Sequence, residues 1–238
     1  MNSIQRTARL AGLLPLILAV IAPFSMLYLP STLIVAGDAA TTAKQIMASD
    51  GLFRLGMVGD SVVFLIEIVL TVLLYELLKP VSKTLSLVAA FARLAMTIVQ
   101  GINLLNHFFV LLLLSGAGYL AVFSSDQLHA LVLLFLNAHE SVVQIWGLFF
   151  GLHLALLGYL VYRSGYIPKI LGGFLVIASL CYFVQNFGMI LLPQYKGLFT
   201  SIGAFSVVEI TFPLWLLIKG VNVQRLQMQS QHDSVSSW

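Results

Sequence analysis

The chain has 238 residues, of which 60% are hydrophobic and only 9% are charged, and its mean hydropathy is +1.00. A soluble domain of this length needs more polar surface, so the composition excludes a water-soluble globular protein and predicts an integral membrane protein. The net charge of +3 does not indicate nucleic-acid binding, because the basic residues lie at the ends of apolar runs and not in one patch. The single cysteine, Cys181, lies in an apolar run and predicts no disulfide framework and no cysteine metal site.

The first apolar run covers residues 10–35 and contains Pro15, Pro23 and Pro30, which we expect to break it. The run is much longer than the apolar region of roughly 7 to 15 residues in a cleaved signal peptide, so we predict that it is a membrane span. After it, Asp38 is placed to cap a short helix over residues 39–49, which we expect to lie at the membrane interface.

The remaining apolar material is long enough for five more spans. Residues 128–162 would form a helix of about 50 Å, which is too long for one crossing. We therefore predict a second interfacial helix over residues 126–137, followed by a span that starts near residue 139. The five predicted spans are residues 52–78, 85–116, 139–162, 170–192 and 198–218.

The predicted fold is all-α: a polytopic membrane bundle of six transmembrane helices, with one or two interfacial helices on the outer face. We expect a single domain over residues 1–223 and a polar, disordered tail over residues 224–238. Six spans place both termini on one side of the membrane. Of the 12 Lys and Arg residues, only Lys44, Arg54 and Lys196 fall on the other side, so the positive-inside rule predicts cytoplasmic termini and a multi-pass protein of the cell inner (plasma) membrane.

Several separate motifs occur in order along the chain. They are Gly37-Asp38-Ala39-Ala40, Phe53-Arg54-Leu55-Gly56, Leu74-Tyr75-Glu76-Leu77-Leu78-Lys79-Pro80-Val81, Phe149-Phe150-Gly151-Leu152-His153, Leu157-Gly158-Tyr159-Leu160, Arg163-Ser164-Gly165-Tyr166-Ile167-Pro168-Lys169-Ile170-Leu171-Gly172 and Leu214-Trp215-Leu216-Leu217-Ile218-Lys219-Gly220. Together they resemble the bacterial membrane family known as domain of unknown function 4386, over about residues 6–223. The resemblance implies a six-helix bacterial inner-membrane protein and implies no particular reaction.

Four titratable residues, which we call the titratable layer, lie about 10 to 12 residues from the predicted inner boundary, near the middle of a hydrocarbon core about 30 Å thick. They are Glu67, Arg93, His153 and Glu209. A carboxylate at this depth costs roughly 2.5 to 3.5 kcal/mol, so it must be paired, protonated or hydrated. The hairpin between the second and third spans places Glu67 opposite Arg93 and predicts an ion pair. His153 and Glu209 lie at the same depth, so they either form a proton-accepting pair or are satisfied separately in the core.

A second set of polar residues, the outer polar layer, lies farther from the inner boundary. Its members are Asp60, Gln100, Asn103, His107, Gln144, Gln185 and Asn186. Asp60 is seven residues before Glu67 and therefore on the same helical stripe. Two interpretations remain open: a structural network between helices, or a polar pocket open to the outside.

Metal and cofactor binding have weaker support. His139 and His153 are fourteen residues apart, or about 21 Å along one helix, and cannot hold one ion. A site of His107 with His139 and Glu140 would require two helices to converge, and no His-Glu-x-x-His motif is present. We predict no metal, no cofactor and no catalytic residues.

Two functional hypotheses from different classes follow. In the first, the protein binds or transports a small molecule through an outward-facing polar pocket, with the titratable layer below it. In the second, it is a non-catalytic membrane scaffold or accessory subunit. An intramembrane enzyme comes third, so enzymatic activity is not favoured. The expected partners are the lipid bilayer and a small molecule of unknown identity, without nucleic acid. Gly147, Gly151 and Gly158 predict one face for close helix packing, within the chain or between chains.

Overall fold

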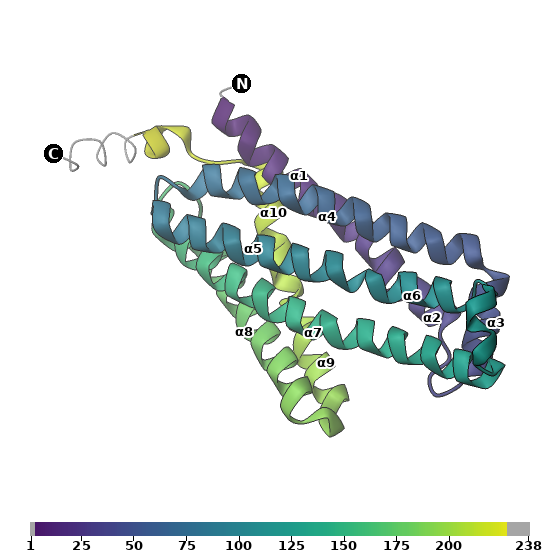
Figure 1. Ribbon diagram of the computed structural model, residues 1–238. Helices are drawn as coiled ribbons and strands as arrows, with labels where there is room; N and C mark the ends of the chain where they lie inside the picture. Colours follow the sequence, from purple (N-terminus) through teal and green to yellow (C-terminus); the bar gives the residue numbers. More distant parts are fainter. Residues whose placement is uncertain (1–2, 228–238) are drawn as a thin grey trace. The chain divides into compact units, whose positions relative to one another are not determined.

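The computed structural model describes residues 3–227, which form helices and connecting turns without any β-strand (Figure 1). Six helical segments in this part of the chain are long and apolar enough to cross a membrane, and they are Ser3–Leu33, Asp50–Leu78, Lys83–Leu113, Ser125–Ser164, Lys169–Leu191 and Pro193–Ile218. The predicted all-α fold with six transmembrane helices is therefore confirmed, and the protein is a multi-pass membrane protein.

The chain divides into two compact units whose boundaries lie inside four of the long helical segments. The first unit comprises residues 3–17, 66–97 and 144–227, and the second unit comprises residues 18–65 and 98–143. The titratable layer lies entirely in the first unit, whereas the outer polar layer is divided between the two.

The first candidate span stays helical through its prolines. Helix α1 (Ser3–Pro23) is followed by a π-helical turn, Phe24–Tyr28, and by α2 (Leu29–Leu33). In the π turn, the amide of Leu29 bonds to the carbonyl of Phe24. The prolines thus change the hydrogen-bond pattern after Pro23 without ending the helix, because backbone groups in a membrane must remain bonded internally.

Asp38 caps α3 (Ala39–Ala48) as the sequence predicts. Its Oδ1 accepts from the amide of Thr41 at 2.9 Å and its Oδ2 from the hydroxyl of Thr41 at 2.6 Å. The face of α3 that carries Ile46 is buried in an apolar cluster of the second unit with Leu33 and Phe53. The interfacial position of α3 stays a prediction.

Helices α4 (Asp50–Leu78), α5 (Lys83–Asn103) and α6 (Leu105–Leu113) follow. The predicted end of the third span is confirmed, because α6 stops before Gly116, which adopts a positive φ of 69°. A short 3-10 turn, Gly118–Val122, leads to the next helix.

The predicted break in the fourth span is wrong. Helix α7 is one continuous helix of 40 residues, Ser125–Ser164, with no separate interfacial helix over residues 126–137. Its length is about 60 Å, twice what a bilayer core requires. The first glycine in α7 is Gly147 and the helix has no proline, so nothing interrupts its hydrogen-bond ladder, and bilayer thickness alone does not break a helix.

The sixth candidate span pairs with the fifth and changes helix type in the middle. Helix α8 (Lys169–Leu191) packs against α9 (Lys196–Ala204), a 3-10 segment (Phe205–Ile210) and α10 (Thr211–Ile218) (Figure 1). Pro213 lacks an amide hydrogen and its ring clashes with the carbonyl four residues earlier, that of Glu209, which explains why the regular α-helix does not run through this region. Residues 223–227 are helical, and residues 228–238 of the predicted tail lie outside the described part of the chain.

The glycine face of α7 packs inside the chain, against α8. An added Cβ on Gly158 would lie 2.7 Å from the carbonyl oxygen of Gly172, one on Gly151 would lie 3.2 Å from the ring of Phe183, and one on Gly147 would strike Asn186. The hydroxyl of Ser179 also donates to the carbonyl of Gly151 at 2.8 Å. These contacts assign the small-residue face to the interface between α7 and α8.

Candidate functional site

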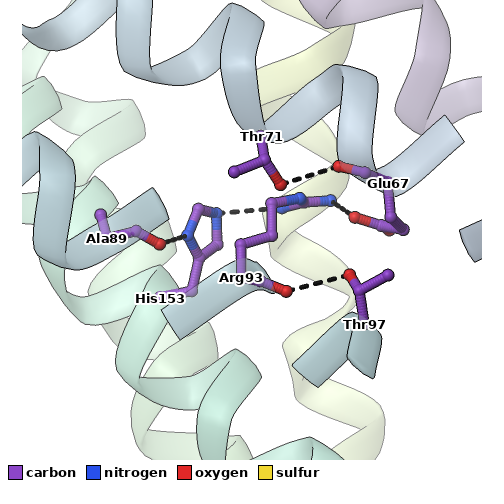
Figure 2. Close-up of polar contacts among 6 residues, drawn as sticks. All are labelled: Glu67, Thr71, Ala89, Arg93, Thr97 and His153. Carbon is purple, nitrogen blue, oxygen red and sulfur yellow. Dashed lines mark hydrogen bonds and ion pairs between the residues drawn. The ribbon is translucent and has the colours of Figure 1, made fainter. Parts of the chain in front are cut away.

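Three members of the titratable layer form one connected chain in the first unit. Glu67 comes from α4, Arg93 from α5 and His153 from α7 (Figure 2). Arg93 Nη2 lies 2.6 Å from Glu67 Oε2, so the predicted ion pair is confirmed, and Arg93 Nη1 lies 2.9 Å from His153 Nε2. All three residues are buried, His153 to 1% exposure. The guanidinium therefore joins three helices.

The contacts of His153 determine which ring nitrogen carries its proton. A guanidinium can only donate, so His153 Nε2 must accept from Arg93. The other nitrogen, Nδ1, lies 2.8 Å from the carbonyl oxygen of Ala89, which can only accept (Figure 2). His153 is therefore neutral in this arrangement, with its proton on Nδ1.

Hydroxyl groups and an aromatic ring complete the surroundings of Arg93. Thr71 donates to the carbonyl of Glu67 at 2.8 Å, and Thr97 donates to the carbonyl of Arg93 at 2.9 Å (Figure 2). The guanidinium also lies over the ring of Phe150, 5.8 Å from its centroid. The two threonine hydroxyls are thus satisfied within their own helices, and of these three groups only the ring of Phe150 contacts the guanidinium itself.

Glu209 does not pair with His153, which corrects one interpretation of the layer. Both ring nitrogens of His153 are taken by other partners, and the hydroxyl of Tyr182 on α8 donates to Glu209 Oε1 at 3.3 Å. Tyr182 packs edge-on against Phe150 at 4.9 Å, so Glu209 joins the layer through aromatic rings. The contact of Tyr182 with Glu209 could not be predicted from the sequence, because it depends on how α8 packs against the sixth span.

Three members of the outer polar layer, Gln144, Gln185 and Asn186, lie in the first unit. Asn186 is buried and donates to the carbonyl of Tyr182 at 2.7 Å. Gln185 packs against Gly203, and Gln144 is half-buried. These residues support the structural interpretation of the layer in this unit.

The other four members lie in the second unit, where two of them line a small cavity. Asp60 and His107 line this cavity together with Ser25 of the π turn, and its volume is about 20 Å³. Asp60 is 3% exposed, and its Oδ1 has no hydrogen-bond partner. His107 Nδ1 also has none. Ser25 was missed in the sequence, although Pro23 before it signals the irregular turn that brings it here.

Gln100 and Asn103 form a bridge beside two stacked histidines. Asn103 donates to Gln100 Oε1 at 3.3 Å and to the carbonyl of His139 at 3.0 Å. The rings of His107 and His139 stack with their centroids 4.0 Å apart, and Phe53 meets His107 edge-on at 5.2 Å. Residues 3–227 hold no group of three or more His, Cys, Asp or Glu placed to bind a metal ion.

The family described as "Domain of unknown function (DUF4386)" matches residues 10–220. The chain belongs to this family. One relative is an "Uncharacterized protein" of Archaeoglobus fulgidus, which is 32% identical over 167 residues, 69% of this chain and 83% of the relative. No solved structure matches the chain. The DUF4386 assignment confirms the resemblance seen in the motifs.

Proposed function

We propose that this protein binds or transports a small solute in the membrane, and that the solute is a proton or a small cation held by Asp60. The observation that carries the proposal is the Asp60 carboxylate, which is buried, lines a cavity and leaves Oδ1 without a partner. A carboxylate in apolar surroundings must be neutralised by a proton or a positive ligand.

The lining of the cavity supports this ligand class. Within the described part of the chain it includes no lysine or arginine that would neutralise Asp60, and it is otherwise mainly apolar, with Phe53 and Met57 among its members. A volume of about 20 Å³ is sufficient for one water molecule or a small ion and excludes a large substrate. Ser25 and His107 supply further polar atoms at the same cavity.

The test is the unfolding temperature of the purified protein in Li⁺, Na⁺ and K⁺ at constant ionic strength, with proton uptake measured in proteoliposomes. A cation at about 100 times its dissociation constant adds about 2.7 kcal/mol to the free energy of unfolding, so the midpoint should rise. Asp60→Asn should abolish the rise and any pH-driven flux. Asp50→Asn, the same change at an exposed position of α4, is the matched control.

An alternative is a non-catalytic scaffold or accessory subunit. The connected contacts of Glu67, Arg93 and His153 favour it, because they hold three helices together and leave little room for a ligand. The scaffold hypothesis is favoured if two results are obtained. Wild type and Asp60→Asn must show the same unfolding midpoint with every cation and the same proton flux, and the protein must purify with a fixed partner.

The proposed topology places both termini in the cytoplasm and the protein in the cell inner membrane. The support is the excess of Lys and Arg at the ends of spans on that side, including Lys79 and Lys83 between α4 and α5. A tag added after residue 238 should be cleaved or labelled only from the cytoplasmic side, and access from the outside would refute this topology.

A further inference from the structure

Apart from the Asp60 cavity of the second unit, the protein has a larger cleft in the first unit, at the start of the fifth candidate span and the end of the sixth. Helix α8 begins at Lys169 and α10 ends at Ile218. The turn before α8 and the turn after α10 enclose a cleft of about 610 Å³. This volume falls within the range of about 300 to 1,000 Å³ found for small-molecule sites. The cleft is separate from the cavity at Asp60.

The charge of this cleft has one sign. Three cationic residues, Lys169, Lys219 and Arg225, line it, and no aspartate or glutamate of residues 3–227 is among its lining residues. The first amides of α8, which starts at Lys169, lie here as well and have no side-chain cap. Both features favour an anion.

The walls of the cleft are held by hydrogen bonds within the unit. The amide of Asn222 donates to the carbonyl of Tyr166 at 3.0 Å, and Arg225 Nη1 donates to the carbonyl of Gly165 at 3.2 Å. On the other side, the amide of Val221 donates to Gln5 Oε1 at 3.2 Å. The cleft is therefore formed before a ligand arrives, and Arg225 keeps further N–H groups for one.

We propose that this cleft binds a phosphate-bearing anion, either the headgroup of an anionic phospholipid or a soluble phosphate. Lysine and arginine side chains with helix amides are the groups that recognise phosphate. Trp215 lines the cleft one turn before the end of α10, a position typical of side chains at the level of lipid headgroups.

The experiment compares wild type with the double variant Lys169→Gln/Lys219→Gln. Each protein is placed in nanodiscs of phosphatidylcholine with increasing phosphatidylglycerol, and retained phosphatidylglycerol is measured by native mass spectrometry. Loss of each lysine should weaken retention about fivefold. Lys83→Gln is the matched control, since Lys83 is an exposed lysine at the start of another helix, outside the cleft.

Inorganic phosphate distinguishes the two sources. If phosphatidylglycerol is retained and millimolar phosphate does not displace it, the ligand is a lipid headgroup. If phosphate alone raises the unfolding midpoint in phosphatidylcholine nanodiscs, and the double variant loses this rise, the ligand is soluble. The variant Lys169→Arg/Lys219→Arg should restore binding in either case and confirms that the fold is intact. Equal losses in Lys83→Gln and the double variant, or no binding of either probe, would overturn the proposal.

Discussion

Arg93 Nη1 donates to His153 Nε2 at 2.9 Å, and this contact from α5 to α7 makes Nε2 a hydrogen-bond acceptor. The Nδ1–H of His153 donates a hydrogen bond to the carbonyl of Ala89 at 2.8 Å. A second proton on the ring would point an N–H at the guanidinium and break the contact. His153 in this arrangement is a neutral link between helices and not a member of a proton-accepting pair with Glu209.

The first prediction concerns the tautomer of His153. In protein with ¹⁵N-labelled histidine, nuclear magnetic resonance at neutral pH should show the His153 ring neutral with its proton on Nδ1, because Arg93 occupies the lone pair of Nε2. The His153→Asn variant identifies the signal by its loss. A ring protonated on Nε2, or on both nitrogens, would contradict the contact with Arg93.

The second prediction concerns the buried ion pair. Glu67→Gln leaves the Arg93 guanidinium without its counter-charge and should lower the free energy of unfolding by about 3 to 5 kcal/mol, measured by denaturation in mixed micelles. Glu76→Gln removes the exposed partner of Lys79 and should cost less than about 1 kcal/mol. Equal effects of the two substitutions would show that the Glu67 carboxylate is not buried against Arg93.

The third prediction concerns the acid sensitivity of α3. The hydrogen bond from the side chain of Thr41, followed by that from its amide, lowers the pKa of Asp38 below its ordinary value. A lowered pKa means that the cap contributes stability above the unfolded pKa of about 3.9 and loses it as pH falls through the lower folded value. The protection of the α3 amides against hydrogen exchange, relative to the intrinsic rate at each pH, should fall across that acidic range.

Asp38→Asn provides the control for this experiment. Asparagine also caps helices, so protection of α3 at neutral pH should be retained, but the acid-dependent loss should disappear because the amide does not titrate. An acid-dependent loss that persists in Asp38→Asn would assign the effect to another group.

The fourth prediction concerns Tyr166, which lies in the turn between α7 and α8. Its hydroxyl donates to the carbonyl of Leu77 at 2.7 Å, near the end of α4, and burial raises the pKa of Tyr166 above its ordinary value. The phenol stays neutral in the folded protein, so its contribution to stability is complete below about pH 10 and decreases as pH rises beyond that value.

Tyr166→Phe should lower the free energy of unfolding by about 1 kcal/mol at neutral pH, because the carbonyl of Leu77 loses its donor. It should also reduce the loss of stability between pH 10 and 11, measured by the unfolding midpoint. Tyr159→Phe, at an exposed position of α7, should change neither quantity. An unchanged alkaline loss in Tyr166→Phe would refute the assignment.

The fifth prediction concerns the close approach of α7 and α8. Gly158→Ala places a methyl group 2.7 Å from the carbonyl oxygen of Gly172 and should cost about 1 to 3 kcal/mol, because backbone atoms must move apart. Gly173→Ala adds the same group in α8 where no atom lies within 4 Å, and it should be neutral or stabilising. Their unfolding midpoints, measured side by side, give the comparison.

The number of spans, the N-cap at Asp38 and the end of the third span at Gly116 could be read from the sequence alone. Hydrocarbon length, an aspartate before a helix and a glycine with positive φ are local properties of a few neighbouring residues. The ion pair of Glu67 and Arg93 could also be predicted, because a short turn fixes the register of two consecutive helices.

The tertiary structure alone decided the partners that lie on helices distant in sequence. Depth in the membrane placed His153 and Glu209 at one level, but the rotation of each helix about its axis turned His153 toward Arg93 and brought Tyr182 to Glu209. Likewise, only the packing of the second unit put Asp60 and His107 at one cavity. Hydropathy and spacing determine how deep a side chain lies, whereas side-chain packing determines which neighbour it faces.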